Sequence, residues 1–455
     1  MVRFGRGVVL LIIGLVSFSP SILHGAAAQT LVGAATGNRQ ALTWARSYSQ
    51  AAGWCCIGGA STVHQTSDSG YIVGGASYTS QSTSSIAQVL KLDRVGEIQW
   101  QRVYGPGWIV SIQQTQHGGY IAADATTFGT GVGTSILRLD LMGNIVWQRF
   151  YNATVYAIQE TSDGGYVVSG AIVSFAYGYE VSSGAWIARL DSAGDILWQR
   201  LVEDEGPVFD SFNSVSQTRD GGFAVAGFTW SGIVAHLWVM KFDSGGSLLW
   251  QNVYTGGGIT GAFSIQQTSD GGFIVGGFTE EIYLEAAWLL KLDSSGGIVW
   301  QKAFAVGDSS RAYSEFYSIQ QTSDGGYVAT GEGPTDVIVV RTDSSGNLVW
   351  EKGLGGGPRT VVGYSVDQTR DGGFIVAGQT ISCCGYVWLV KIDANGDCCA
   401  RINVPINSPV INTSDSQIAT YFSARDANVT VTYASEVALP ANAMVLTQCY
   451  PRITH

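Results

Sequence analysis

Seven near-identical strings divide most of the chain into repeats. Each string runs from Gln or Glu through Thr to a polar turn and an aromatic residue, as in Gln267-Thr-Ser-Asp270-Gly-Gly-Phe273. The Asp position is filled by Asp68, His117, Asp163, Asp220, Asp270, Asp324 and Asp371, so successive copies are 49, 46, 57, 50, 54 and 47 residues apart. A period near 50 residues is typical of a unit of four strands that cannot bury its apolar faces alone and must stack on its neighbours.

Two further strings follow the first in each repeat. A cation, a short residue pair ending in Asp, and a Gly three residues later recur, as in Lys291-Leu-Asp293. A tryptophan then closes six of the repeats, at Trp100, Trp147, Trp198, Trp250, Trp300 and Trp350. We interpret these tryptophans as residues that pack one repeat against the next.

Four short strands fit within each repeat. In the fifth repeat we expect strands a to d at residues 263–268, 273–278, 287–292 and 298–303. Residues 287–292 alternate between two faces with the period of two that a strand imposes. The Asp-Gly pair between strands a and b suits a type I′ turn, in which both central residues need positive φ. The Asp between strands c and d suits a type I turn, with its side chain capping backbone amides.

Calcium binding is the functional alternative for the seven acids of the turns. Calcium takes six to eight oxygen ligands, whereas each turn offers a single carboxylate. Turn chemistry is therefore the favoured interpretation.

These patterns together predict an all-β fold, a seven-bladed β-propeller with four antiparallel strands per blade. An eighth copy of strand d precedes the first repeat at Leu42 to Tyr48, whereas the seventh repeat has Ala400 in place of the recurring tryptophan. We predict that the N-terminal strand completes blade seven beside the strand of Trp388. Closure of this kind joins the two ends of the chain.

Residues 1–28 resemble a secretory signal peptide. Arg3 and Arg6 precede an apolar run at residues 8–18, and Ala26-Ala27-Ala28 supplies a small-residue cleavage site. The run is too short to span a bilayer, so we expect no transmembrane anchor. We expect a secreted protein that is extracellular or held at the cell surface, or periplasmic in a Gram-negative host.

The remaining segments are a leader at residues 29–41, the propeller at 42–404 and a β-rich tail or cap at 405–455. The tail loses the Gly-rich repeat and alternates Thr, Ser, Asn and Val. At about 50 residues it is marginal as an independent core. We therefore expect extra strands or an extended cap.

The formal net charge is −11, with only 24 Lys and Arg residues. An acidic chain repels phosphate backbones, so nucleic acid and anionic membrane surfaces are poor candidate partners.

The seven cysteines include two doublets, Cys55/Cys56 and Cys383/Cys384. Under the predicted closure both doublets lie on blade seven, where a disulfide between them would lock the ring in an exported protein. A metal site is the alternative, but the doublets lack Cys-x-x-Cys spacing and the chain has only five histidines. We predict neither a metal site nor a cofactor.

The repeat, Gln-Thr-Ser-Asp-Gly-Gly-Tyr followed by Lys-Leu-Asp-x-x-Gly and Trp-Gln-Lys, resembles the secreted β-propeller-repeat proteins of bacteria and archaea. The resemblance covers roughly residues 42 to 400. The repeat is also distantly similar to that of NHL-type propellers. It implies the fold and export. No catalytic residues come with it.

Function must therefore come from the variable loops. The d–a and b–c loops open on one face, and long insertions on one face are typical of a binding side. The candidate ligand-binding residues there are Trp54, Trp108, Tyr177, Tyr179, Glu180, Trp230, His236, Glu281 and Tyr283. Aromatic rings beside carboxylates can stack on and hydrogen-bond a glycan, or bind a protein.

The leading hypothesis is a noncatalytic scaffold that binds a protein or a glycan through this face. The alternative is a carbohydrate-active hydrolase or lyase that uses loop carboxylates such as Glu203, Asp204, Glu205, Glu280 and Glu281. Two carboxyl groups flanking a central pocket would favour the hydrolase. The structural alternative for all these residues is loop packing and solubility. We name no catalytic residue.

Overall fold

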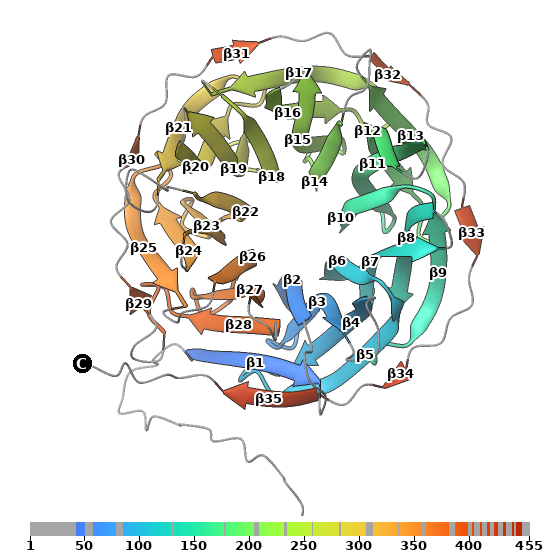
Figure 1. The fold of residues 1–455 in the computed structure, drawn as a ribbon, viewed down its shortest axis with the longest axis vertical. Coiled ribbons are helices and arrows are strands. Elements are labelled where there is room, and N and C mark those ends of the chain that lie inside the picture. Colours follow the sequence, from blue (N-terminus) through green and yellow to red (C-terminus); the bar gives the residue numbers. More distant parts are fainter. Residues whose placement is uncertain are drawn as a thin grey trace, which may run out of the picture.

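The computed structural model describes residues 42–50, 58–78, 85–128, 131–176, 179–203, 209–231, 234–256, 258–281, 284–305, 313–334, 336–355, 360–381 and 387–398, and seven short strands between residues 403 and 447. Every element in these ranges is a β-strand. The strands form seven sheets arranged as blades around one axis (Figure 1). The predicted seven-bladed propeller is confirmed. Across these ranges no helix is long and apolar enough to cross a membrane.

Each blade has four antiparallel strands, a to d, with strand a nearest the axis (Figure 1). In order from a to d, blade one contains β2 (Gly58–Gln65), β3 (Tyr71–Tyr78), β4 (Ser85–Leu92) and β5 (Ile98–Pro106); blade two contains β6 (Trp108–Gln114), β7 (Tyr120–Phe128), β8 (Gly131–Leu139) and β9 (Ile145–Tyr151); blade three contains β10 (Thr154–Glu160), β11 (Tyr166–Ala176), β12 (Tyr179–Leu190) and β13 (Ile196–Glu203). Blade four contains β14 (Ser211–Gln217), β15 (Phe223–Ser231), β16 (Val234–Phe242) and β17 (Leu248–Thr255); blade five contains β18 (Thr260–Gln267), β19 (Phe273–Glu281), β20 (Leu284–Leu292) and β21 (Ile298–Phe304). Blade six contains β22 (Glu315–Gln321), β23 (Tyr327–Glu332), β24 (Val337–Thr342) and β25 (Leu348–Leu354); blade seven contains β26 (Thr360–Gln368), β27 (Phe374–Ile381), β28 (Val387–Ile392) and β1 (Trp44–Gln50).

The N-terminal strand closes the ring as predicted. Strand β1 pairs antiparallel with β28, with Trp44 opposite Lys391 and Ser47 opposite Trp388. The strand begins at Trp44 rather than at Leu42. Trp44 also packs edge-on against Tyr71 of blade one, with ring centroids 5.7 Å apart. Strand β1 therefore serves blade seven as its strand d.

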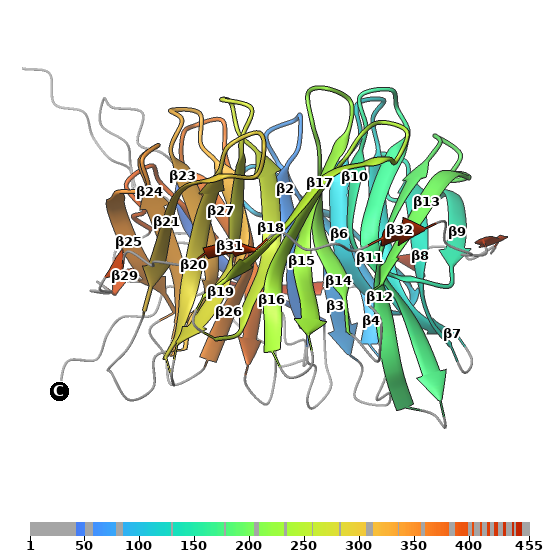
Figure 2. The same ribbon diagram turned by 90° about the horizontal axis from the view of Figure 1, so that it is seen from above.

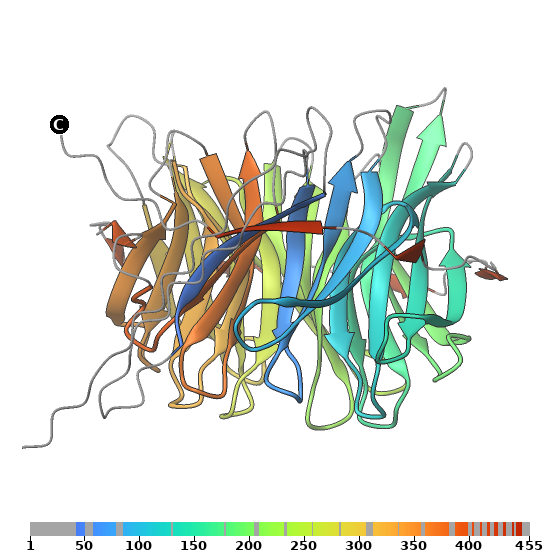
Figure 3. The same cartoon turned by 90° about the horizontal axis from the view of Figure 1, so that it is seen from below.

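The C-terminal tail adds a fifth strand to every blade, on the outer side of strand d. Its strands are β29 (Asn403–Val404) on β25, β30 (Val410–Ile411) on β21, β31 (Ser416–Ile418) on β17, β32 (Ser423–Arg425) on β13, β33 (Val431–Tyr433) on β9, β34 (Leu439–Pro440) on β5 and β35 (Ala443–Thr447) on β1. Figure 3 shows β1 in blue with the red tail strand along its outer side. The tail forms extra strands, and they are distributed over the whole ring.

The a–b turns have a geometry different from the one we predicted. In blade five the N–H of Gly271 donates to the carbonyl of Thr268 at 3.0 Å, and Gly271 has a φ of +85°. Asp270 is not at positive φ, so the predicted type I′ turn is wrong. A single left-handed glycine at the end of the loop is typical of a three-residue hairpin loop, which is one residue longer than the two-residue loop of a type I′ turn.

The acids of these turns pair with the cations of the second string. In six blades the carboxylate meets a buried Lys or Arg of strand c, in the pairs Asp68–Lys91, Asp163–Arg189, Asp220–Lys241, Asp270–Lys291, Asp324–Arg341 and Asp371–Lys391. Blade two has His117 instead, and its Arg138 donates to the carbonyls of Gly118 and Tyr120 at 2.6 and 3.2 Å. The acids therefore have structural partners.

The c–d turns match the prediction. In blade five the Asp293 carboxylate accepts hydrogen bonds from the backbone N–H groups of Ser295 and Gly297, both at 2.8 Å. The same pair of capping bonds recurs at Asp93, Asp140, Asp191, Asp243, Asp343 and Asp393. The side chain thus satisfies amides that the tight turn leaves without a backbone partner.

The recurring tryptophans pack each blade against the next, as predicted. Trp300 of blade five meets Tyr327 of blade six edge-on, with centroids 5.6 Å apart, and its indole N–H donates to the carbonyl of Ser344 at 3.3 Å. Apolar clusters likewise combine neighbouring blades, as where Trp288 of blade five packs with Leu237 of blade four. The hydrophobic core is therefore a ring of seven interfaces.

Adjacent inner strands are joined by side chains. Between blades five and six, the N–H groups of Ile319 and Gln321 donate to Ser264 Oγ at 3.2 Å and to Gln266 Oε1 at 2.6 Å. In return, Gln321 Oε1 accepts from the backbone N–H of Ser269 at 2.7 Å. This last bond is made at all seven interfaces, the seam included. The Ser-Ile-Gln-Gln part of the repeat thus satisfies amides on the open edge of strand a.

Candidate functional site

The d–a and b–c loops lie on the face opposite the a–b and c–d turns (Figure 2), because the strands of each blade alternate in direction. We call this side the loop face. It differs between blades, whereas the turns on the other side repeat almost unchanged. The loop face therefore carries the protein groups that distinguish one blade from another, and a ligand that contacts only a few blades should bind there.

Three of the predicted binding residues have described side chains, and they lie in blades two and four. Trp108 begins β6 in blade two, and its indole N–H donates to Ser61 Oγ of blade one. Trp230 lies in β15 of blade four, where its backbone N–H donates to Asp210 Oδ1 at 3.2 Å. His236 lies opposite Thr229 in the same blade, and burial lowers the pKa of its imidazole. Trp230 and His236 therefore lie on paired strands of one blade, whereas Trp108 lies in another blade.

The other predicted residues are placed in part or not at all. The backbones of Tyr179 and Glu180 lie in β12, and that of Glu281 lies at the end of β19, but their side chains are outside the described part. Trp54, Tyr177, Tyr283, Cys55, Cys56, Cys383 and Cys384 lie wholly outside the described residues. The disulfide between the two cysteine doublets stays a prediction.

The inner strands carry a feature that we did not predict. Each strand a has a β-bulge at the equivalent position, and the extra residue is Ser61, Val110, Tyr156, Asn213, Phe263, Tyr317 or Tyr364 in blades one to seven. A bulge re-aims a side chain and is frequent beside functional sites. The residue at this position changes from blade to blade.

Three consecutive bulge residues are aromatic and touch across blade boundaries. The ring of Tyr317 lies 4.9 Å from that of Phe263 and 5.3 Å from that of Tyr364, measured between centroids. Phe278 stacks on Phe263 with centroids 5.8 Å apart. All four rings are half-buried and so keep some surface open to solvent. We call Phe263, Phe278, Tyr317 and Tyr364 the aromatic arc.

Three glutamates gather beside the aromatic arc at the ends of strands on the loop face. Glu315 begins β22 and lies opposite Glu332 of β23. Ser314 brings Glu285 of blade five alongside, because its N–H donates to the Glu285 carbonyl at 3.2 Å. Tyr317 Oη donates to Glu332 Oε2 at 3.4 Å and so links the carboxylates to the arc. We call Glu285, Glu315 and Glu332 the acidic group.

The acidic group is crowded with like charge. Burial, a hydrogen bond to Glu315 and the charges of Glu315, Glu280 and Glu332 raise the pKa of Glu285 to about 9. Burial and the Glu315 charge also raise the pKa of Glu332, although the hydrogen bond from Tyr317 opposes the change. Burial and like charge therefore favour the protonated form of Glu285.

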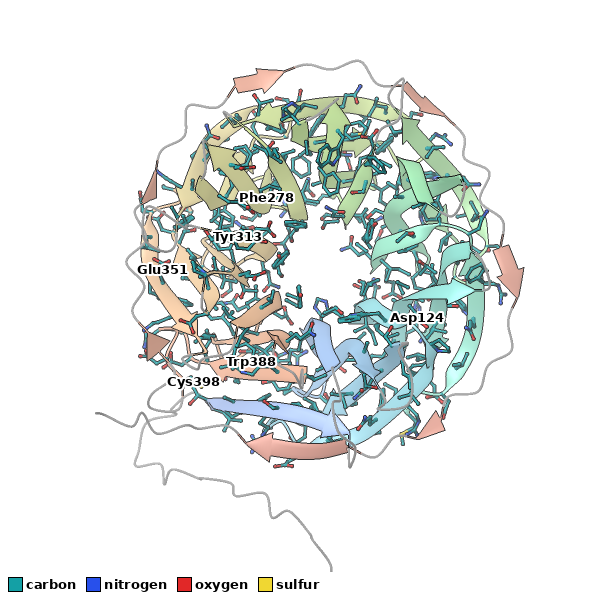
Figure 4. The ribbon with its side chains drawn as sticks, in the orientation of Figure 1. Asp124, Phe278, Tyr313, Glu351, Trp388 and Cys398 are labelled. Atoms are coloured by element: carbon teal, nitrogen blue, oxygen red, sulfur yellow. The ribbon has the colours of Figure 1, made fainter. Side chains whose placement is uncertain are left out.

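Tyr313 marks where the acidic group meets solvent. Glu315 is only 8% exposed, whereas Tyr313, two residues earlier, is 40% exposed. Burial and the neighbouring glutamates raise the pKa of the Tyr313 hydroxyl. Figure 4 places Tyr313 and Phe278 in the same sector of the ring, in blades six and five. A ligand approaching the loop face there would meet aromatic surface first and carboxyl groups behind it.

The sequence contained a signal for part of this site. The residue before the Ser-Ile or Ser-Val pair of strand a changes from blade to blade, and it is aromatic in blades five to seven. Tyr313, Glu285 and Glu315 belong to the long loops that the strand order assigns to the loop face, where we expect binding, but they are not among the individual candidate residues that we named. Their convergence depends on the packing of blade five against blade six.

The geometry differs from that of a glycosidase. The paired carboxyls of such enzymes flank the scissile bond about 5 Å or more apart, with the sugar between them. A hydrogen bond to Glu315 is instead among the causes that raise the pKa of Glu285, so these two carboxyl groups lie closer together than that. Within the described ranges no group of three His, Cys, Asp or Glu residues is arranged to hold a metal ion.

No protein-family model matches this chain, and no curated protein matches it in sequence. Solved structures with a similar fold include Sqt1 of Chaetomium thermophilum bound to the N-terminus of ribosomal protein L10, at 11% identity and a TM-score of 0.43, covering 73% of this chain and 96% of that one. Sqt1 alone matches at 11% identity and a TM-score of 0.42, covering 73% and 94%. The likeness is too low to bear on function.

Proposed function

We propose that this protein is exported and serves as a noncatalytic scaffold that binds a protein or a glycan through its loop face. The binding site is the aromatic arc together with the acidic group, in blades five to seven. The observation that carries the proposal is that four part-exposed rings contact one another and that one of them, Tyr317, hydrogen-bonds Glu332 of the acidic group. Two of the three carboxyl groups have pKa values raised by burial and by like charge. Aromatic planes stack on sugars and apolar side chains, and carboxyl groups supply the polar contacts.

The test is a glycan and surface-protein binding screen with the mature chain, followed by the variant Tyr317→Ala. Tyr317 contacts both neighbouring rings and Glu332, so we expect its loss to weaken binding at least about tenfold, as for a central aromatic anchor. Tyr156→Ala is the matched control, because Tyr156 occupies the equivalent bulge in blade three and is 39% exposed. Equal losses in both variants would contradict the assignment of the site.

The pH dependence separates the two kinds of ligand. A basic protein segment favours the ionised form of Glu285, so its affinity should rise as the pH approaches 9, the value to which the pKa of Glu285 is raised. A neutral glycan gains nothing from that ionisation, and its affinity should not rise. A glycosidase assay in parallel tests the catalytic alternative. Turnover that Glu285→Gln or Glu315→Gln abolishes would refute a noncatalytic role.

Export has its own test. If residues 1–28 are a removed signal peptide, N-terminal sequencing of the protein recovered outside the cytoplasm should begin near Gln29. Recovery of the intact N-terminus from the cytoplasm alone would contradict export.

A further inference from the structure

The tail strands meet all seven blades at the same place. In every blade the third residue after the tryptophan position of strand d lies opposite one tail residue, in the pairs Gly353–Val404, Ala303–Ile411, Val253–Ile418, Leu201–Arg425, Phe150–Thr432, Val103–Leu439 and Ser47–Leu446. The tail residues are spaced by seven throughout. The tail therefore advances seven residues per blade, without one step out of register.

This spacing has a simple physical basis. Strand d is the outer edge of each four-stranded blade, and an edge presents unpaired N–H and C=O groups. Seven extended residues span about 23 Å, at roughly 3.3 Å each. A tail of constant step can therefore reach the equivalent edge in every blade, provided that the blades are equally spaced around the rim.

Each step is too short to hold by itself. The tail strands pair with two or three residues of a blade, apart from β35, which has five pairs. Isolated strand pairs of this length are not stable in water. Because the steps are joined in one chain, each bound step raises the effective concentration of the next. The tail is thus a multivalent ligand of the rim.

The last strand of the tail, β35, pairs with β1, the strand that closes the ring. The tail starts on blade six, passes blades five, four, three, two and one, and ends with β35 on β1. Strand β1 therefore lies between β28 and β35. Its position in blade seven exists only after the N-terminal strand has closed the ring. The last and longest step consequently requires a closed seam.

We propose that the outer rim of the ring is a sevenfold strand-binding surface whose ligand is this chain's own tail, residues 403–447, and that tail binding locks the seam between β28 and β1. This inference is independent of the ligand-binding role of the loop face. The rim recognises backbone groups at a seven-residue period.

The test uses the full chain with a site-specific protease sequence inserted between Cys398 and Asn403, cut after folding. We expect the cut tail to remain bound during gel filtration and to be exchanged by an excess of a labelled synthetic peptide of residues 403–447. When the tail is removed, hydrogen exchange should rise in all seven strands d and most in β1. A tail that leaves on cutting, with no change in exchange, would overturn the proposal.

Two altered peptides test the period. Deleting residues 419–425 removes one whole step and keeps the period, so this peptide should bind and leave one blade edge unprotected. Deleting residues 420–422 keeps more of the chain but breaks the period, and we expect it to compete at least about tenfold less well, because its two halves cannot bind together. Equal competition by both peptides would refute recognition of the period. Hydrogen exchange on the uncut natural chain provides a measurement that needs no variant: open exchange along the outer edges of strands d would also refute the proposal.

Discussion

We predict that Asp→Asn substitution of an a–b turn acid lowers the free energy of unfolding most in the blades whose strand c carries a lysine. In blade five the Asp270 carboxylate accepts from Lys291 Nζ at 2.9 Å and from the N–H of Gly272 at 3.0 Å, and the lysine side chain is 3% exposed. Asp270→Asn keeps one oxygen but turns an N–H₂ donor toward a buried ammonium. A hydrogen bond to a charged group contributes about 1.5–3 kcal/mol. Because the Asp270 side chain is 61% exposed, solvent screening reduces the expected loss to about 1–2 kcal/mol.

Blades with an arginine should respond less to the same substitution. Blade two has no acid at this position, and Arg138 is held there by backbone carbonyls. A guanidinium has five donors, and that of Arg189 donates to the backbone carbonyls of Tyr166 and Leu190, whereas Lys291 Nζ donates to one backbone carbonyl, that of Leu292 at 2.9 Å. Asp163→Asn, which faces Arg189, is therefore the matched control. Lys291→Arg should also restore part of the stability that Asp270→Asn removes.

The pH dependence gives a second measure of the same pair. Burial alone would raise the pKa of Asp270, but hydrogen bonds from Thr268, Lys291 and Gly272 lower it to about 2. A carboxyl whose pKa is lower in the folded state stabilises the fold above the unfolded value of 3.8 and loses that contribution as the pH falls toward 2. The difference between the natural chain and Asp270→Asn should shrink over this window.

The assay is thermal unfolding by scanning calorimetry at several pH values. In a chain of this size we expect Asp270→Asn to lower Tm by roughly 1–3 °C at pH 7. The reasoning is refuted if Asp163→Asn lowers Tm as much as Asp270→Asn does, or if the effect of Asp270→Asn persists unchanged at pH 2.

Two further substitutions test the blade interfaces and the acidic group. Trp300→Ala removes the edge contact with Tyr327 and the indole hydrogen bond to Ser344, and it should lower the free energy of unfolding by about 2–3 kcal/mol, as for a half-buried aromatic ring. The neighbouring Val299→Ala changes a side chain that is 58% exposed and should leave the free energy of unfolding almost unchanged. Equal losses for both variants in urea unfolding would contradict the packing role. Glu285→Gln should stabilise the protein at alkaline pH, because a pKa raised from 4.5 to about 9 makes the natural chain lose stability as the pH rises through that window. The gain should be about 1 kcal/mol near pH 9 after allowance for solvent screening and should vanish near pH 5; a gain that is constant with pH would show that the raised pKa is not its cause.

Most of the fold was predictable because short segments of the sequence specify the strands and turns. The Asp of the c–d turn and the glycine of the a–b turn act within a few residues of themselves, so each repeat declares its own strands and turns. The closing strand was predictable for the same reason, since Leu42 to Tyr48 is a recognisable copy of strand d and the seventh repeat lacks one. The error in the a–b turn type arose because Asp-Gly fits several short hairpin loops, which differ by one residue in the position of the left-handed glycine.

The candidate site was predictable only as a face. The alternating strand directions assign the variable loops to one side, and Tyr313, Glu285 and Glu315 belong to that side. Their grouping depends on Ser314 joining blade six to β20 and on a bulge that turns Tyr317 toward Phe263 and Tyr364. These contacts join residues that are 29 to 54 positions apart, and no local pattern encodes them.

Backbone turns and two-residue alternation are properties of short segments, so the number of blades, the strands within them and the strand that closes the ring follow from the amino-acid sequence. Which residues face one another depends instead on how the blades pack: the turn acids meet the strand c cations, the aromatic arc lies beside the acidic group, and the tail pairs with the outer edges. The seven-residue spacing of the tail can be counted in the sequence, but it can be interpreted only when the tail is seen to pair with seven equally placed strands d. A ligand's period can be recognised once the surface that it matches is known.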